Sequence, residues 1–151
     1  MKIINKRYCD WDKNIQRELL CATFKDGFIR KVIEFNPDQD TFVAYYGGKI
    51  IIGWALIFKT PYGDAVEIFI NKEFRNQGFG RVLIEEIITK YKKIILAKHN
   101  KVTNYLFSKL ESEYPNNISA IQWTDEVKEK FYNLVGYVFI DVYTCKEPTS
   151  S

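Results

Sequence analysis

The chain has 151 residues, of which 46% are hydrophobic, 27% are charged and 16% are aromatic. These values are ordinary for a globular protein, and the length allows one domain to bury its own core. The net charge of +3 arises from 22 basic and 19 acidic residues. That excess is too small to indicate the concentrated basic face that nucleic-acid-binding proteins usually carry.

The cysteines and the lengths of the apolar runs indicate the cellular compartment and whether a metal site or a membrane span is present. The three cysteines, Cys9, Cys21 and Cys145, lack the spacing of a metal site, and their odd number leaves one unpaired in any disulfide scheme. No apolar run approaches the roughly 18 residues of a membrane span, and the N-terminal apolar run is too short for a signal peptide. We therefore expect a cytoplasmic protein with reduced thiols, no metal and no membrane partner, present as a monomer or a homodimer.

The first half of the chain predicts strands separated by two short helices. Glycine can end a helix, so we expect Gly27 to separate the two helices. Gly47 and Gly48 are typical of a hairpin turn between two β-rich segments. In chain order, the elements expected here are a strand at Lys2–Asn5, helices at Trp11–Phe24 and Phe28–Phe35, and strands at Thr41–Tyr46 and Lys49–Phe58.

The segment Val66–Tyr91 organises the rest of the chain. Val66–Ile70 mixes β-branched and aromatic residues over the length of a buried strand. Apolar residues then recur at helical spacing from Leu83 to Tyr91, with charged residues on the other face. The sequence therefore predicts a strand that leads into an amphipathic helix through a short polar turn.

That turn contains two glycines, Gly78 and Gly80, at the expected start of the helix. A helix N-terminus presents unpaired N–H groups and a positive dipole end, and glycine lets an anion approach them closely. Arg75 and Arg81 add positive charge on either side. The turn therefore predicts a phosphate site, although a Gly-x-Gly pair by itself is also common in plain tight turns.

Beyond this helix, apolar runs predict alternating strands and helices without a repeat or a linker. The expected elements are Lys93–Lys98 (strand), Val102–Leu110 (helix), Ile118–Trp123 (strand), Asp125–Leu134 (helix) and Tyr137–Thr144 (strand). The strand–helix–strand crossover makes the fourth and fifth strands, on either side of the amphipathic helix, parallel neighbours. We expect a single domain over residues 1–146 and a short polar tail at 147–151.

Two motifs in this order resemble those of the GNAT superfamily, the N-acyltransferases that use acetyl-coenzyme A. The first is the strand, the Arg-x-x-Gly-x-Gly turn and the amphipathic helix within Val66–Tyr91. The second is Phe131–Tyr137, in which an aromatic pair is followed by Gly136 and another aromatic residue. Two features depart from the family pattern: Asp125 replaces a usual asparagine, and residues 101–123 add a helix and a strand.

The resemblance implies an α+β fold, which some schemes class as α/β. Its central sheet is expected to be mixed but mostly antiparallel, with about six to seven strands and helices on both faces. The fourth and fifth strands are expected to be parallel and to splay apart, which leaves a gap for the cofactor.

The resemblance also implies a site for acetyl-coenzyme A. The backbone of the fourth strand would hold the pantetheine arm, and the amides of the glycine turn would hold the pyrophosphate. An asparagine after the fifth strand is a candidate contact to the pantetheine amides. The cofactor-binding residues so assigned are Ile68, Phe69, Ile70, Arg75, Asn76, Gln77, Gly78, Phe79, Gly80, Arg81 and Asn100.

Acyl transfer to an amine needs a neutral amine, a stabilised oxyanion and a protonated leaving thiolate. Tyr132 lies four residues before Gly136, where the family places the tyrosine that protonates the thiolate. Glu67 is a candidate base on the fourth strand, with a structural salt bridge as the alternative, and His99 or water stays open as the base. A covalent acyl-enzyme is disfavoured, because no serine or cysteine has a base at recognisable spacing.

We therefore expect an enzyme that transfers an acetyl group from acetyl-coenzyme A to an amine by direct attack in a ternary complex. The alternative is a catalytically weak module of the same fold that binds acyl-coenzyme A as a sensor or an assembly part. The acceptor stays open among small amines, amino acids, protein amines and a charged transfer RNA, the last being the one nucleic acid that this interpretation allows.

Overall fold

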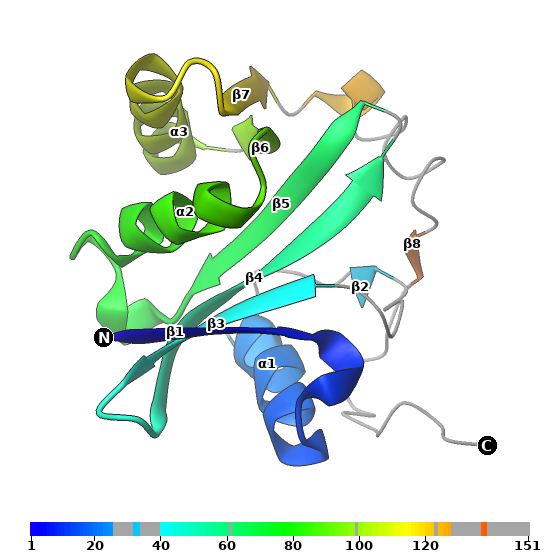
Figure 1. The fold of residues 1–151 in the computed structure, drawn as a ribbon, viewed down its shortest axis with the longest axis vertical. Helices are drawn as coiled ribbons and strands as arrows, with labels where there is room; N and C mark the ends of the chain where they lie inside the picture. Colours follow the sequence, from blue (N-terminus) through cyan, green and yellow to red (C-terminus); the bar gives the residue numbers. More distant parts are fainter. Residues whose placement is uncertain are drawn as a thin grey trace.

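The computed structural model describes residues 1–25, 32–33, 40–60, 62–98, 100–122, 124–127 and 137–138. Within them the chain forms a six-stranded sheet in the order β1-β3-β4-β5-β6-β7 and a two-stranded sheet, β2-β8 (Figure 1). The strands of the larger sheet are β1 (Lys2–Arg7), β3 (Asp40–Tyr46), β4 (Ile50–Thr60), β5 (Gly63–Ile70), β6 (Ile94–Lys98) and β7 (Ile118–Gln122). The smaller sheet pairs β2 (Val32–Ile33) with β8 (Tyr137–Val138).

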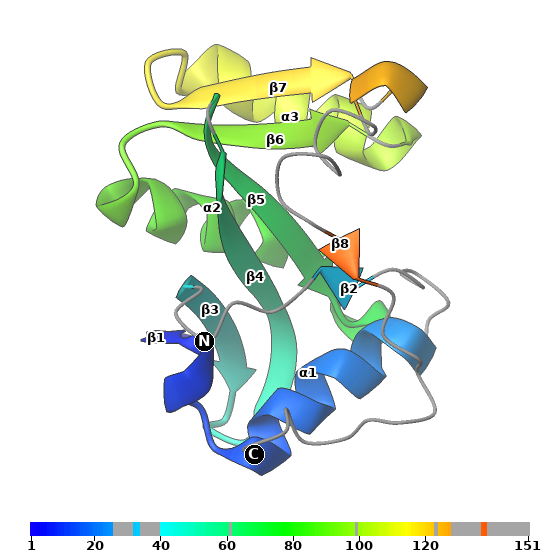
Figure 2. The ribbon, with the colours of Figure 1, turned by 90° about the vertical axis from the view of Figure 1, so that its right-hand side faces the viewer.

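Helices cover both faces of the larger sheet (Figure 2). They are α1 (Lys13–Lys25), α2 (Phe79–Lys90) and α3 (Lys101–Glu113), with short 3-10 helices η1 (Tyr8–Asp10) and η2 (Lys72–Phe74). Successive side chains of β4 point to opposite faces of the sheet and so belong to two separate cores. Trp54 and Leu56 pack with Leu19 of α1 in the first core. Ala55 and Ile57 face the other way, into the core formed with α2 and α3. The expected α+β fold with a mixed sheet and helices on both faces is confirmed.

The predicted helix at Phe28–Phe35 is wrong where the structure describes it. Val32 and Ile33 form strand β2, which pairs antiparallel with Val138 and Tyr137. The pairing of two β-branched residues with a distant strand overrides the helical spacing read from the local sequence. The other residues of that predicted helix lie outside the described residues.

The expected divergence of the fourth and fifth strands, which are β5 and β6, is visible in the register. The two strands are parallel and pair only at Asp64–Val66 with Ile94–Leu96. Beyond that point β5 continues to Ile70 and β6 to Lys98 without pairing to each other, and Figure 2 shows the two strands diverging. The end of β5 therefore pairs with β4 on one side, and its β6 pairing ends at Val66.

A close approach between β4 and β5 fixes the end of β5. The β3–β4 register shifts between Ala44 and Tyr45, which places one extra residue on β4. Asn71, which follows β5, donates from its backbone N–H to Ile52 O at 2.8 Å and from Nδ2 to Ile51 O at 2.5 Å. These bonds hold the chain at the point where it leaves β5 for η2 and α2.

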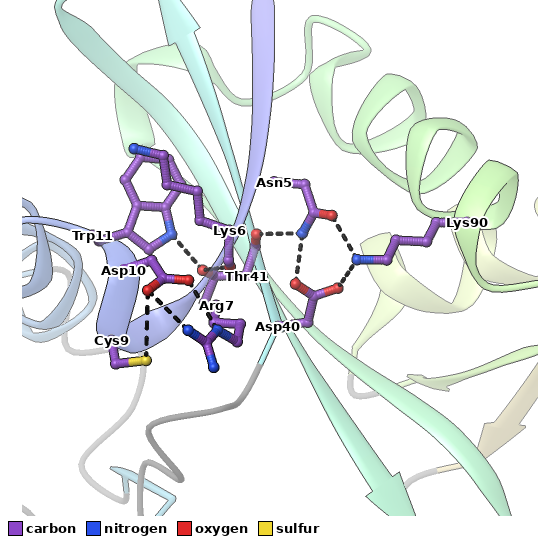
Figure 3. Close-up of polar contacts among 9 residues, drawn as sticks. All are labelled: Asn5, Lys6, Arg7, Cys9, Asp10, Trp11, Asp40, Thr41 and Lys90. Atoms are coloured by element: carbon purple, nitrogen blue, oxygen red, sulfur yellow. Dashed lines mark hydrogen bonds and ion pairs between the residues drawn. The ribbon is translucent and has the colours of Figure 1, made fainter.

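At the opposite edge, one carboxylate joins β1, β3 and α2 (Figure 3). Asp40 accepts hydrogen bonds from Asn5 Nδ2, Lys90 Nζ and Tyr91 Oη, each at 2.7 Å. Burial acts to raise the pKa of Asp40, but these hydrogen bonds outweigh it and hold the pKa below its ordinary value. The C-terminal end of α2 is thereby fixed to the sheet.

Among the described residues, no helix combines the length and apolar character needed to cross a membrane. The same residues contain no cluster of histidine, cysteine, aspartate or glutamate side chains arranged to hold a metal ion.

Candidate functional site

The turn between β5 and α2 presents a group of free backbone amides. Gly78 is the N-cap of α2, with a positive φ of 85°, and the first helical bond runs from Val82 N to Gly78 O at 3.2 Å. The amides of Phe79, Gly80 and Arg81 precede that bond and meet no acceptor in the described part of the chain. A helix start with unpaired N–H groups attracts an anion, so the geometry supports the predicted phosphate site.

The two glycines of this turn serve different purposes. A Cβ on Gly78 would meet nothing within 4 Å, so glycine is favoured there by its left-handed conformation. A Cβ on Gly80 would lie 3.7 Å from Leu106 Cδ2 of α3 and 3.9 Å from Ile70 Cγ1 of β5. Both distances are ordinary van der Waals contacts, so position 80 has room for a Cβ, whereas position 78 favours glycine for its backbone conformation. Asn76 has a positive φ of 61° and completes the tight turn.

The two arginines that flank the glycines behave differently from one another. Arg75 turns back to β5, where Nε donates to Ile70 O at 2.8 Å and the guanidinium lies 5.4 Å from the Phe69 ring centroid. Arg81 pairs with Glu113 of α3 and, at 3.6 Å, with Glu85. The hydrogen bond with Glu113 raises the pKa of Arg81. Its backbone amide, rather than its neutralised side chain, is thus the group available at the turn.

Two asparagines at the start of α3 lie close to the end of β6. Asn100 caps the helix, because its Oδ1 accepts from Thr103 N at 2.9 Å and Thr103 bonds back to the Asn100 N–H. The structure therefore shows Asn100 as a helix cap, and its contact to the cofactor stays a prediction. Asn104, one turn further on, has a buried Oδ1 with no hydrogen-bond partner among the described residues. Sequence reasoning missed Asn104, because nothing in its spacing distinguishes it from other polar helix residues.

Glu67 lies on β5 at the first position beyond the β5–β6 pairing. Its neighbours on the same face, Ala65 and Phe69, belong to the core on the α1 side. Its side chain is half-buried, and desolvation by burial raises its pKa to about 7. The described residues form no ion pair with it, which counts against the salt-bridge alternative.

Of the other residues that the sequence analysis singled out, two lie outside the described residues and one lies inside them. Tyr132 and His99 are both outside them. Asp125 is inside, in a helical turn over residues 125–127 where Val127 N bonds to Thr124 Oγ1 at 3.2 Å. A helix therefore starts where the sequence predicts one.

The β5–β6 pair, whose pairing ends at Val66, and the free start of α2 agree with the arrangement that the resemblance implies. The chain matches the family model of the acetyltransferase (GNAT) domain over residues 37–139, and it belongs to that family. Members of this family use acyl-coenzyme A as the acyl donor, and the free amides of α2, beside the two diverging strands, fit such a group. No curated protein sequence matches the chain.

Two solved structures resemble the chain at low identity. A point variant of the BH1408 protein from Bacillus halodurans is 16% identical, covers 88% of this chain and 90% of its own, and has a TM-score of 0.40. A candidate acetyl transferase from Pyrococcus furiosus is 16% identical, covers 93% and 94%, and has a TM-score of 0.38. At these TM-scores the two structures add nothing to the family assignment.

Proposed function

We propose that the protein transfers an acetyl group from acetyl-coenzyme A to an amine by direct attack. The observation that carries this proposal is the position of Glu67, whose carboxyl, with a pKa of about 7, stands where β5 parts from β6. A base is most effective when its pKa lies near the working pH. Glu67 is therefore suited to take a proton from an ammonium group at neutral pH, either directly or through water.

Several other residues would bind the acyl donor. The backbone of Ile68–Ile70 would pair with the pantetheine arm, and the amides of Gln77–Arg81 would bind the pyrophosphate. Asn104 Oδ1 would accept a hydrogen bond from a pantetheine amide, which would satisfy a buried acceptor that has no described partner. When bound, the donor supplies an activated thioester carbonyl.

The chemistry at this site then needs two proton transfers by the chain. With the donor bound, Glu67 would take one proton from the ammonium group, and the neutral nitrogen would then attack the acyl carbon and release its second proton to water as the carbon–sulfur bond breaks. Tyr132 gives its phenolic proton to the departing thiolate, and a tyrosine with an ordinary pKa near 10 carries that proton at neutral pH. The products are an N-acetylated amine and free coenzyme A.

The test is thiol release from acetyl-coenzyme A with a panel of primary amines, with the acetylated product identified by mass spectrometry. We expect release that depends on an amine, with a fall of about 10²-fold or more for Tyr132→Phe. Acetyl-coenzyme A that binds without any amine-dependent release would contradict the proposal and favour the alternative, a binding module of the same fold.

A further inference from the structure

Two tryptophans are buried on the α1 side of the sheet, and their indole N–H groups differ. Trp11 donates from Nε1 to Thr41 Oγ1 at 2.5 Å (Figure 3). Trp54 is 5% exposed, and its Nε1 has no hydrogen-bond partner in the described part of the chain. Buried donors are rarely left without a partner in folded proteins, so the Trp54 N–H calls for a specific explanation.

The register places Trp54 beside the candidate base. On β4 and β5, Trp54 pairs with Phe69 and Leu56 pairs with Glu67. Trp54 and Leu56 share one face of β4, and Phe69 lies in the same core on the α1 side. Trp54 and Glu67 are therefore diagonal neighbours on one face, at a spacing of about 7–8 Å that an aromatic side chain can span.

The same face is the one from which an amine would approach. The free amides of α2 lie on the other side of the sheet, where Leu83, Ile84 and Phe107 fill the core. A donor held by those amides reaches the open edge of β5 from the α2 side. The amine must contact its base, Glu67, and so approaches from the α1 side, where Trp54 lies.

We propose that Trp54 determines acceptor specificity by donating a hydrogen bond from its indole N–H to an oxygen of the amine substrate. This inference rests on the proposed function and narrows it. The acceptor class is an amine with a carbonyl oxygen close to the reacting nitrogen, as in an amino-acid amide or a peptide N-terminus. Such an acceptor would satisfy the buried donor only when it is bound, which favours it over an amine that lacks the oxygen.

The direct test is the indole ¹⁵N–¹H spectrum, because the chain has only 3 tryptophans. The Trp54 signal is assigned as the one missing from Trp54→Phe. Coenzyme A is added first, followed by paired probes such as 2-phenylethylamine and phenylalaninamide, which differ by a carboxamide next to the amine. We expect the carboxamide probe to move the Trp54 signal downfield and to leave the Trp11 signal in place. A Trp54 signal that stays in place with every oxygen-bearing probe would overturn the inference.

Kinetics supply a second readout with a matched control. Trp54→Phe is expected to lower kcat/KM for the carboxamide probe about tenfold more than for the plain amine, as the loss of one hydrogen bond predicts. Trp11→Phe removes a similar ring and a satisfied hydrogen bond, so it is expected to lower the unfolding midpoint more than Trp54→Phe and to keep the preference between probes. Equal preference in wild type and Trp54→Phe would overturn the inference. A lack of thiol release with every amine would contradict the proposed function instead, and the spectrum would still decide the role of Trp54.

Discussion

Arg75 donates from Nε to the backbone carbonyl oxygen of Ile70 at 2.8 Å, so the turn before α2 is fixed to the last residue of β5. The same guanidinium lies over the Phe69 ring. The predicted pyrophosphate site and the predicted pantetheine site are therefore joined through one side chain, and their relative position depends on it.

Replacing Arg75 with methionine keeps the apolar stem of the side chain and removes the donor and the charge. A hydrogen bond from a charged group is worth about 1.5–3 kcal/mol, so we expect coenzyme A to bind about tenfold more weakly to Arg75→Met. Isothermal titration calorimetry with coenzyme A measures this change. Affinity equal to that of the wild type would show that the turn keeps its position without Arg75.

For Arg81 we expect the opposite result, a coenzyme A affinity that hardly depends on the side chain. Its guanidinium is paired with Glu113 and Glu85, with a side chain that is 32% exposed. We expect Arg81→Ala to leave the free energy of unfolding almost unchanged, because solvent screens an exposed ion pair. Coenzyme A affinity should change by less than about threefold, because the backbone amide is kept. A loss of affinity as large as that of Arg75→Met would assign the Arg81 side chain to the cofactor after all.

Gly53 is predicted to be indispensable for the close contact of β4 with β5. A Cβ at this position would lie 2.5 Å from Phe69 O, a backbone atom that cannot move without shifting the strand. We expect Gly53→Ala to cost about 3 kcal/mol in a urea unfolding experiment. Gly47→Ala is the control, because its Cβ would meet nothing within 4 Å and only the positive φ is strained, at about 1 kcal/mol. Equal losses for both variants would contradict this account of Gly53.

The raised pKa of Glu67 predicts how stability depends on pH. Its ordinary value is 4.5 and its folded value is about 7, so the folded state binds the proton more tightly than the unfolded state. The resulting stabilisation is fully present below pH 4.5 and is lost as the pH rises to 7. The glutamine in Glu67→Gln cannot ionise, so this variant should not lose stability between pH 4.5 and pH 7. The unfolding midpoints of the wild type and the variant should therefore diverge over that pH range. Parallel curves between pH 4 and pH 8 would show that Glu67 titrates normally (about 4–5).

Much of the fold could be predicted because the local pattern and the tertiary contacts agree. Val66–Ile70 alternates between two cores, as a buried strand should, and Gly78 marks the start of the helix that follows. The predicted helix at Phe28–Phe35 fails for the opposite reason. Val32 and Ile33 pair with Tyr137 and Val138. The periodicity of a short segment cannot reveal a strand partner so far away in the sequence.

The same limit applies to the candidate site. The sequence showed Arg75 and Arg81 on either side of the glycines, but it could not show that Glu113 forms an ion pair with the Arg81 guanidinium. Glu67 could be selected as a candidate base, whereas its raised pKa follows from burial that only the packed structure defines. The Trp54 N–H, which has no hydrogen-bond partner among the described residues, likewise depends on its surroundings rather than on any motif.

The central proposal is that an acyl-coenzyme A binds along the part of β5 that does not pair with β6, with its pyrophosphate on the free amides of α2. Backbone ¹⁵N–¹H spectra recorded during a titration with coenzyme A test it most directly. The account predicts the largest shifts at the amides of Ile68–Ile70 and Gly78–Arg81, with little change at Lys13–Arg17 of α1. Shifts that gather away from β5 and the start of α2, or the absence of any shift at saturating coenzyme A, would contradict it.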